Sequence, residues 1–143
     1  MKMSMSVKKP ERQQKVRQRN MDSSLTKRNQ RRIKRKLRVR KHVRGSSDKP
    51  RLSVLKTNKH ISAQLIDDEN HVTILSAGTM HKEFRDGDFG KKSKEAAKQI
   101  GLKIAELAKQ KQIQRVVFDR GRYKFHGVIA ELANAAREAG MQF

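Results

Sequence analysis

The sequence contains no cysteine and no tryptophan, and aromatic residues make up only 4% of its 143 residues. Without cysteine there is no disulfide, no thiolate metal site and no cysteine nucleophile, which is typical of a reducing compartment. With so few rings, the core is expected to be aliphatic. No apolar run approaches the roughly 20 residues of a membrane span. The basic N-terminus also lacks the apolar segment of a signal peptide.

Positive charge is abundant instead, and it is concentrated at the N-terminus. Residues 1–51 contain 20 lysines and arginines against three acids, a net charge of +17, whereas residues 52–143 contain 16 against 11, a net charge of +5. A segment with so much charge of one sign and so few apolar side chains cannot fold alone. It needs a polyanion, and phosphate backbones are the usual one. The composition therefore predicts nucleic-acid binding, without distinguishing DNA from RNA.

Composition divides the chain at about residue 50. Residues 1–50 are predicted to form a basic N-terminal arm, largely disordered or helical, that ends in a linker over 45–50. Residues 51–143 are predicted to form one globular domain. The first part of the arm, residues 1–25, is expected to be disordered when free. It also resembles an organellar transit peptide, and Met21 is an alternative start.

Hydrophobic periodicity predicts an α+β domain that begins with three strands. The segments 51–57, 60–66 and 71–77 alternate between apolar and polar residues, with Val72 and Ile74 inward in the third. This pattern indicates a three-stranded antiparallel meander with one apolar and one polar face.

Two helices and one later strand are expected to complete the domain, in the order β-β-β-α-β-α. An amphipathic helix over 93–109, capped by Ser93, and a second over 128–139, followed by Gly140, should both cover the apolar face. The apolar segment 115–119 is expected to be an interior strand in a mixed sheet, parallel to its neighbour after a right-handed crossover.

Candidate contacts with nucleic acid fall on the arm, on the polar face of the meander with its first turn, and on the loop 119–127. The cations of the arm would follow phosphates: Lys27, Arg28, Arg31, Arg32, Lys34, Arg35, Lys36, Arg38, Arg40, Lys41 and Arg44. Flat polar groups and cations of the meander would follow a shallow RNA minor groove: Ser53, Lys56, Asn58, Lys59, His60 and Gln64. The loop supplies cations, a ring and a helix start: Arg120, Arg122, Tyr123, His126 and Gly127.

Acidic residues at strand ends leave a second hypothesis open. Asp67, Asp68 and Asp119 could bind two metal ions, as the acids of a nuclease do. The structural alternative is turn chemistry for the first two and an arginine partner or helix cap for the third. The histidines show no metal-ligand spacing and no nucleotide-binding or hydrolase motif is present, so no metal, cofactor or catalysis is expected. A sequence-independent compactor of nucleic acid is a third hypothesis.

Four strings of residues closely resemble a known family, the bacterial-type ribosomal protein numbered eighteen in the large subunit. The resemblance covers about residues 25–143 in the family's order and spacing. The strings are RVRKHVRG (38–45), KPRLSVLKTNKHISAQLIDD (49–68), VVFDRGRYKFHG (116–127) and ANAAREAGMQF (133–143).

The resemblance implies a non-enzymatic RNA-binding component of a cytoplasmic or organellar ribosome. Members of the family attach 5S rRNA to the large subunit in the central protuberance. They lie beside a second 5S-binding protein and contact 23S rRNA, without a membrane or a cofactor. By position, the resemblance adds Arg51 to the expected RNA contacts, and His42 is counted with the cations of the arm. The chain departs from the family at Ser62, where an aromatic residue is usual, at Arg122 and at Val128, so the contacts there are expected to differ.

Overall fold

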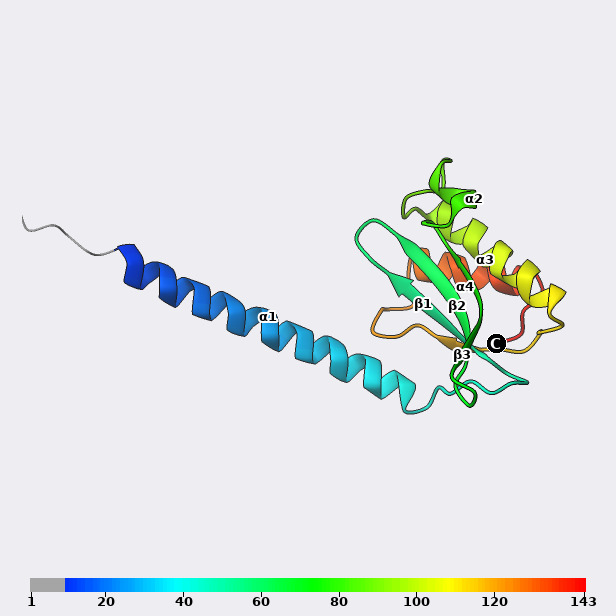
Figure 1. The fold of residues 1–143 in the computed structure, drawn as a ribbon, viewed down its shortest axis with the longest axis horizontal. Coiled ribbons are helices and arrows are strands. Elements are labelled where there is room, and N and C mark those ends of the chain that lie inside the picture. Colours follow the sequence, from blue (N-terminus) through cyan, green and yellow to red (C-terminus); the bar gives the residue numbers. More distant parts are fainter. Residues whose placement is uncertain (1–9) are drawn as a thin grey trace, which may run out of the picture. The chain divides into compact units, whose positions relative to one another are not determined.

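The computed structural model describes the backbone from residue 10 to residue 143 and the side chains from residue 23 onward. The elements are α1 (Pro10–Arg40), β1 (Arg51–Lys56), β2 (Ile61–Asp67), β3 (Val72–Gly78), α2 (Lys82–Arg85), α3 (Lys94–Gln110), β4 (Val117–Asp119) and α4 (Val128–Glu138) (Figure 1). The chain forms two compact units, residues 1–34 and residues 35–143, and the boundary between them falls within α1. The segment expected to be a linker, residues 45–50, lies inside the second unit. Residues 1–9 of the segment expected to be disordered lie outside the described residues, and helix α1 begins at Pro10.

The second unit has the predicted α+β fold. Its four strands form one mixed sheet in the order β3-β2-β1-β4, in which β1, β2 and β3 are the antiparallel meander and β4 lies parallel to β1. Helices α3 and α4 pack against each other and cover one face of the sheet (Figure 1). We call the uncovered face the open face.

The position predicted for the last strand is wrong, because β4 is an edge strand. It has three residues, and Val117 and Phe118 are only half-buried. The apolar run arises because the C-terminal segment covers this edge. Val116 is fully buried and its N–H donates to the carbonyl of Gln142 at 3.0 Å, while the ring of Phe143 stacks on Phe118 with centroids 5.2 Å apart.

The alternation predicted for the third strand also fails at its first position. Val72 was expected to point inward, but its side chain is 52% exposed, while Ile74 is half-buried as a neighbour of the core. Val72 pairs with Asp67 at the very end of the sheet, beside the turn 68–71. Further along the strand the register shifts, since Leu65 pairs with Leu75 whereas Ile66 pairs with Thr73, which leaves Ile74 as a bulge.

The helices confirm the predicted caps. The hydroxyl of Ser93 accepts a hydrogen bond of 2.9 Å from the N–H of Ala96, and Gly140 follows α4 with a φ of +103°. The segment between β3 and α3 also contains the short helix α2, which the periodicity did not predict. The core is aliphatic, as expected, and its largest fully buried apolar side chains are Leu52, Ile61, Leu65, Ile100, Ile104, Val116, Ile129 and Leu132.

Within the described part of the chain, no helix is both long enough and apolar enough to cross a membrane.

Candidate nucleic-acid interface

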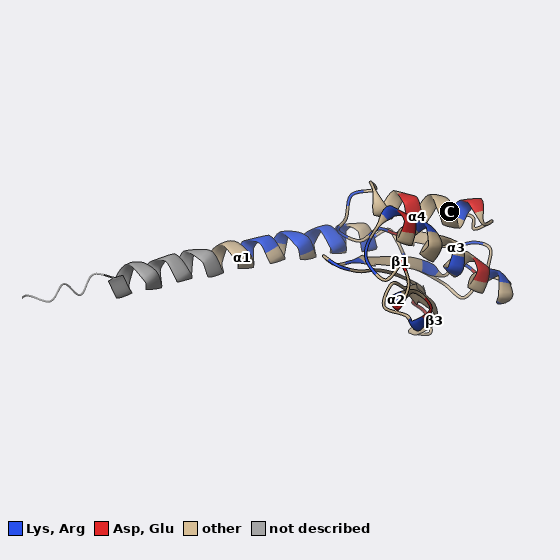
Figure 2. Cartoon of the chain, turned by 90° about the horizontal axis from the view of Figure 1, so that it is seen from above, with Lys and Arg blue, Asp and Glu red and all other residues tan. Residues whose placement is uncertain are grey.

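The described part of α1 is rich in lysine and arginine, as Figure 2 shows. Between Asp22 and Asp48 the sequence has no acidic residue, and the cations from Lys27 to Arg38 are all exposed. Three apolar side chains of this helix, Leu25, Ile33 and Leu37, are also exposed. Like charges three and four residues apart destabilise an isolated helix. A polyanion that neutralises them would therefore stabilise α1.

The open face carries small polar groups in a row across three strands. Ser53 of β1 pairs with Gln64 of β2, which pairs with Ser76 of β3. None of these three side chains is buried. Gln64 and Ser76 of this row also line a shallow hollow of about 230 Å³, together with Leu55 and Met80. This exposed row and its hollow leave the sheet accessible to a broad partner.

The turn between β1 and β2 is held in place by side chains. Asn58 and Lys59 are exposed, while the half-buried His60 has its Nδ1 atom 3.0 Å from the hydroxyl of Thr79. Lys92, from the segment before α3, donates its N–H to the carbonyl of Lys59 at 2.7 Å and its Nζ to that of Thr57 at 3.1 Å. Lys92 thus holds the turn from outside the meander and brings a further cation beside it. Sequence reasoning missed it because the contact spans more than thirty positions and no local pattern marks it.

The loop after β4 is tied back to the sheet by Tyr123. Its hydroxyl donates to the carbonyl of Lys56 and accepts from the N–H of Lys56 at 3.3 Å. The cations of Lys56 and Arg122 lie 5.6 Å and 5.2 Å from the centre of its ring, and Arg120 donates to its carbonyl. Tyr123 therefore acts as a packing residue that brings cations together, and its half-buried ring keeps part of its surface accessible.

The end of this loop is more exposed. Lys124, Phe125 and His126 are all exposed, and Gly127 takes a φ of +57° before α4. Phe125 is 46% exposed, and its ring meets that of Phe118 edge-on with centroids 6.0 Å apart. The loop thus offers one ring beside two polar or charged side chains.

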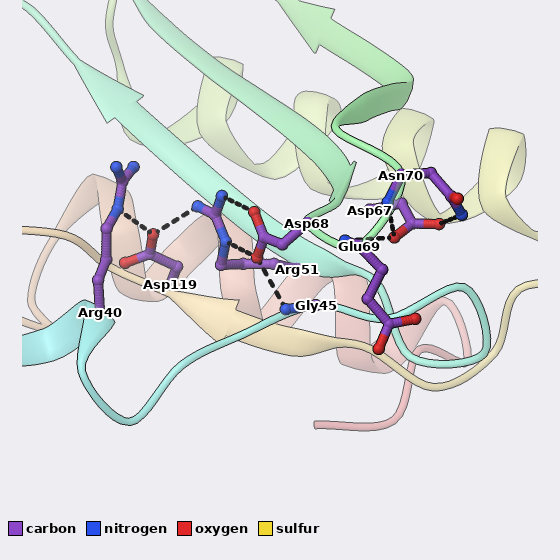
Figure 3. A network of polar contacts seen from close by, with 8 residues as sticks. All are labelled: Arg40, Gly45, Arg51, Asp67, Asp68, Glu69, Asn70 and Asp119. Carbon is purple, nitrogen blue, oxygen red and sulfur yellow. Dashed lines mark hydrogen bonds and ion pairs between the residues drawn. The ribbon is translucent and has the colours of Figure 1, made fainter.

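Arg51 is the predicted contact residue that the fold buries, with only 7% of the residue exposed. Its Nε and Nη2 donate to the carboxylate of Asp68 at 2.7 and 2.6 Å, and its Nη1 donates to Asp119 at 2.9 Å (Figure 3). Hydrogen bonds from Arg51 are the largest cause of the low pKa of Asp68, about 2. The same bonds to Asp68 raise the pKa of Arg51. These donors are used inside the protein.

Two further groups converge on the same carboxylates. The Nε of Arg40, at the end of α1, donates to Asp119 at 3.2 Å, and the N–H of Gly45 donates to Asp68 at 2.8 Å (Figure 3). We call Arg40, Gly45, Arg51, Asp68 and Asp119 the Arg51 network. Asp119 has an arginine partner, as the structural alternative predicted.

Asp67 stabilises the turn that follows β2, as the structural alternative also predicted. It accepts hydrogen bonds from the amide of Asn70 and the hydroxyl of Ser47, both at 2.8 Å, and from the N–H of Glu69 at 2.9 Å. These bonds, that from Asn70 first, lower its pKa. Across the described side chains, no three histidine or acidic residues are grouped so that they could hold a metal ion.

A cationic helix attached to an α+β domain with an uncovered polar sheet face is the architecture of a nucleic-acid-binding protein. Comparison with known proteins gives its family. A family model described as ribosomal L18 of archaea, bacteria, mitochondria and chloroplasts matches residues 26–143. Large ribosomal subunit protein uL18 of Protochlamydia amoebophila is 57% identical over 112 residues, which cover 78% of this chain and 91% of the relative. The same protein of Chlamydia felis is 56% identical over 123 residues, 86% of this chain and all of the relative.

The chain belongs to the ribosomal L18 family, as its sequence strings predicted. It is therefore an rRNA-binding structural protein of the large ribosomal subunit and a component of translation, and it is not an enzyme.

Proposed function

We propose that this protein binds 5S rRNA and helps to attach it to 23S rRNA in the central protuberance of the large subunit. There it would lie beside the second 5S-binding protein and other large-subunit proteins. Because the two relatives compared above are bacterial, we place this ribosome in a bacterial cytoplasm. The observation that supports RNA over another polyanion is the row of polar side chains Ser53, Gln64 and Ser76 on the open face. Groups of this size reach the 2′-hydroxyls of a shallow minor groove.

In this proposal the cations of α1 and of residues 41–44 neutralise phosphates, while the open face and the loop after β4 recognise shape. The proposed contacts of the folded unit are exposed or half-buried: Arg38, Lys41, His42, Arg44, Ser53, Lys56, Asn58, Lys59, His60, Gln64, Arg120, Arg122, Tyr123, His126 and Gly127. Phosphate contacts supply affinity and orientation, whereas discrimination among RNAs comes from shape and 2′-hydroxyl contacts. Arg51 is not among these proposed contacts, and in this proposal it supports the surface through its ion pairs with Asp68 and Asp119.

A salt-titrated binding assay tests this function. Full-length protein is titrated with 5S rRNA and with a structured control RNA of equal length over a range of salt concentrations. Because phosphate contacts weaken with salt for both RNAs, the expected result is 5S binding that persists where control binding has vanished. Equal loss of both would indicate a sequence-independent compactor and would overturn the proposal.

A further inference from the structure

A strongly basic segment is fixed to the folded body by two acids. Residues 38–44, which we call the basic segment, contain three arginines, a lysine and a histidine and no acid. In a chain of net charge +22, repulsion favours moving such a segment away from the body. Instead it is held at two points, one within the segment and one directly after it. The Nε of Arg40 donates to Asp119 at 3.2 Å, and the N–H of Gly45, directly after the segment, donates to Asp68 at 2.8 Å.

Asp119 joins three parts of the molecule. Its side chain is completely buried, and its two oxygens accept from Arg40 of the basic segment, from Arg51 of β1 and from the N–H of Gly121 at the start of the loop after β4. Since Asp119 pairs with Ser53 in the sheet, it lies beside the polar row of the open face. One carboxylate therefore connects the three regions of the folded unit that we propose to contact RNA.

The close packing of Gly45 is independent evidence that the segment is seated. A Cβ atom at this position would lie 2.5 Å from the backbone nitrogen of Arg51 and 2.6 Å from the carbonyl oxygen of Ile66. The carbonyl of Gly45 also accepts from the N–H of Asp68 at 3.3 Å. The end of the basic segment thus lies directly on β1 and β2, in a space that admits no side chain.

We propose that Asp119 and Asp68 are positioning residues that hold the basic segment against the sheet, so that segment, open face and loop bind RNA as one preformed surface. Neither acid touches the RNA; each acts through Arg40, Arg51 or Gly45. This arrangement would strengthen RNA binding, because a segment that is already ordered loses little further conformational entropy when it binds. This inference rests on the proposed function for the identity of the RNA, but not for the seating of the segment.

If only the charge of Asp119 matters, Asp119→Asn should change RNA affinity in one direction; if Asp119 positions the basic segment, the change should be the opposite. Removing a negative charge from a polyanion-binding protein should tighten RNA binding if charge alone counts. If Asp119 positions the basic segment, the variant should bind 5S rRNA about tenfold more weakly, with a smaller dependence on salt because fewer phosphates are contacted together. The matched control is Asp88→Asn, which removes the same charge from an exposed loop residue and should bind as tightly as the unmodified protein or more tightly.

A second pair of variants leaves the charge unchanged. Gly45→Ala should displace the basic segment and weaken RNA binding several-fold, since the Cβ would meet backbone atoms that cannot move aside. Its control is Gly87→Ala, where nothing lies within 4 Å of the added carbon. If Asp119→Asn does not fold, as shown by a circular-dichroism melt, Gly45→Ala against Gly87→Ala decides the question.

Amide hydrogen exchange of residues 41–49 in the free, full-length protein gives a readout that RNA contacts do not affect. Faster exchange there in both test variants, together with weaker binding, would support the proposal. Binding by Asp119→Asn that equals or exceeds that of Asp88→Asn, or unchanged exchange in the test variants, would overturn it. A failure of the proposed function is separate, because it would appear as equal affinity of the unmodified protein for 5S and control RNA.

Discussion

Gly101 of α3 lies against the carbonyl oxygen of Leu132 in α4, so close that a Cβ atom at position 101 would lie 2.4 Å from that oxygen. Gly101→Ala is therefore expected to lower the free energy of unfolding by about 1–3 kcal/mol, because overpacking outweighs the gain of up to about 1 kcal/mol in helix propensity. Urea unfolding of this variant beside Gly87→Ala checks the prediction. Equal stability of the two variants would contradict the tight contact between the helices.

Stability should fall in acid as Asp68 becomes protonated. Its pKa is lowered from 3.8 to about 2 in the folded protein, first by hydrogen bonds from Arg51. Because the folded pKa is the lower one, the ionised group stabilises the fold above pH 3.8, and this contribution is lost as the pH falls towards 2. Thermal melts between about pH 5 and pH 2 should show a smaller decline for Asp68→Asn, which has no charge to lose there. Parallel declines would argue against the ion pair.

The hydroxyl of Tyr123 should stabilise the loop after β4. Tyr123→Phe removes the hydrogen bonds to the backbone of Lys56 and keeps a ring near the cations of Lys56 and Arg122. The expected loss in unfolding free energy is about 0.5–1.5 kcal/mol, the usual net contribution of such a bond. Chemical denaturation measures it. Tyr123→Leu serves as the comparison, and it should lose more stability because the ring also packs against the core.

Two nested truncations should separate charge from structure. Removing residues 1–34 takes away one compact unit and should leave the melting temperature of the other unchanged. Each RNA phosphate that the shortened protein no longer neutralises should reduce the slope of log affinity against log salt by about 0.7–0.9. Removing residues 1–44 also deletes Arg40 and its bond to Asp119, so the melting temperature should fall as well, by the equivalent of about 1 kcal/mol. Equal melting temperatures would show that Arg40 does not stabilise the domain.

Much of the fold could be predicted from local pattern. The alternation in 51–57 and 60–66 located two strands, and Ser93 and Gly140 marked helix ends, because these signals depend on neighbours in the sequence. The bulge in β3 left no such signal. Nor did the edge position of β4, since the partner that shields this strand, the segment from Met141 to Phe143, is remote in sequence.

The candidate site was harder to predict for the same reason. The sequence identified the cations, and the exposure of Lys59, His126 and Arg44 is compatible with a role in binding. It did not reveal that Asp68 and Asp119 bind the donor atoms of Arg51, because the pairing of Arg51 with Asp119 spans 68 positions. In a basic protein, every lysine and arginine is a candidate contact with the polyanion. Only the burial and the ion pairs of a side chain distinguish an arginine that supports the fold from one that contacts the RNA.

The borders of the sheet also bear on how the protein behaves when it is made in excess of its RNA. An unpaired strand edge is a template for self-association. Here the register shift at Ile74 interrupts the β3 border, while on the other side β4 has only three residues and the residues just before it bridge to the C-terminal segment, through Arg115 and Gln142. Neither border offers a long, flat strand for another copy to pair with. The domain is thereby protected against sheet-to-sheet aggregation during the interval between its synthesis and its assembly.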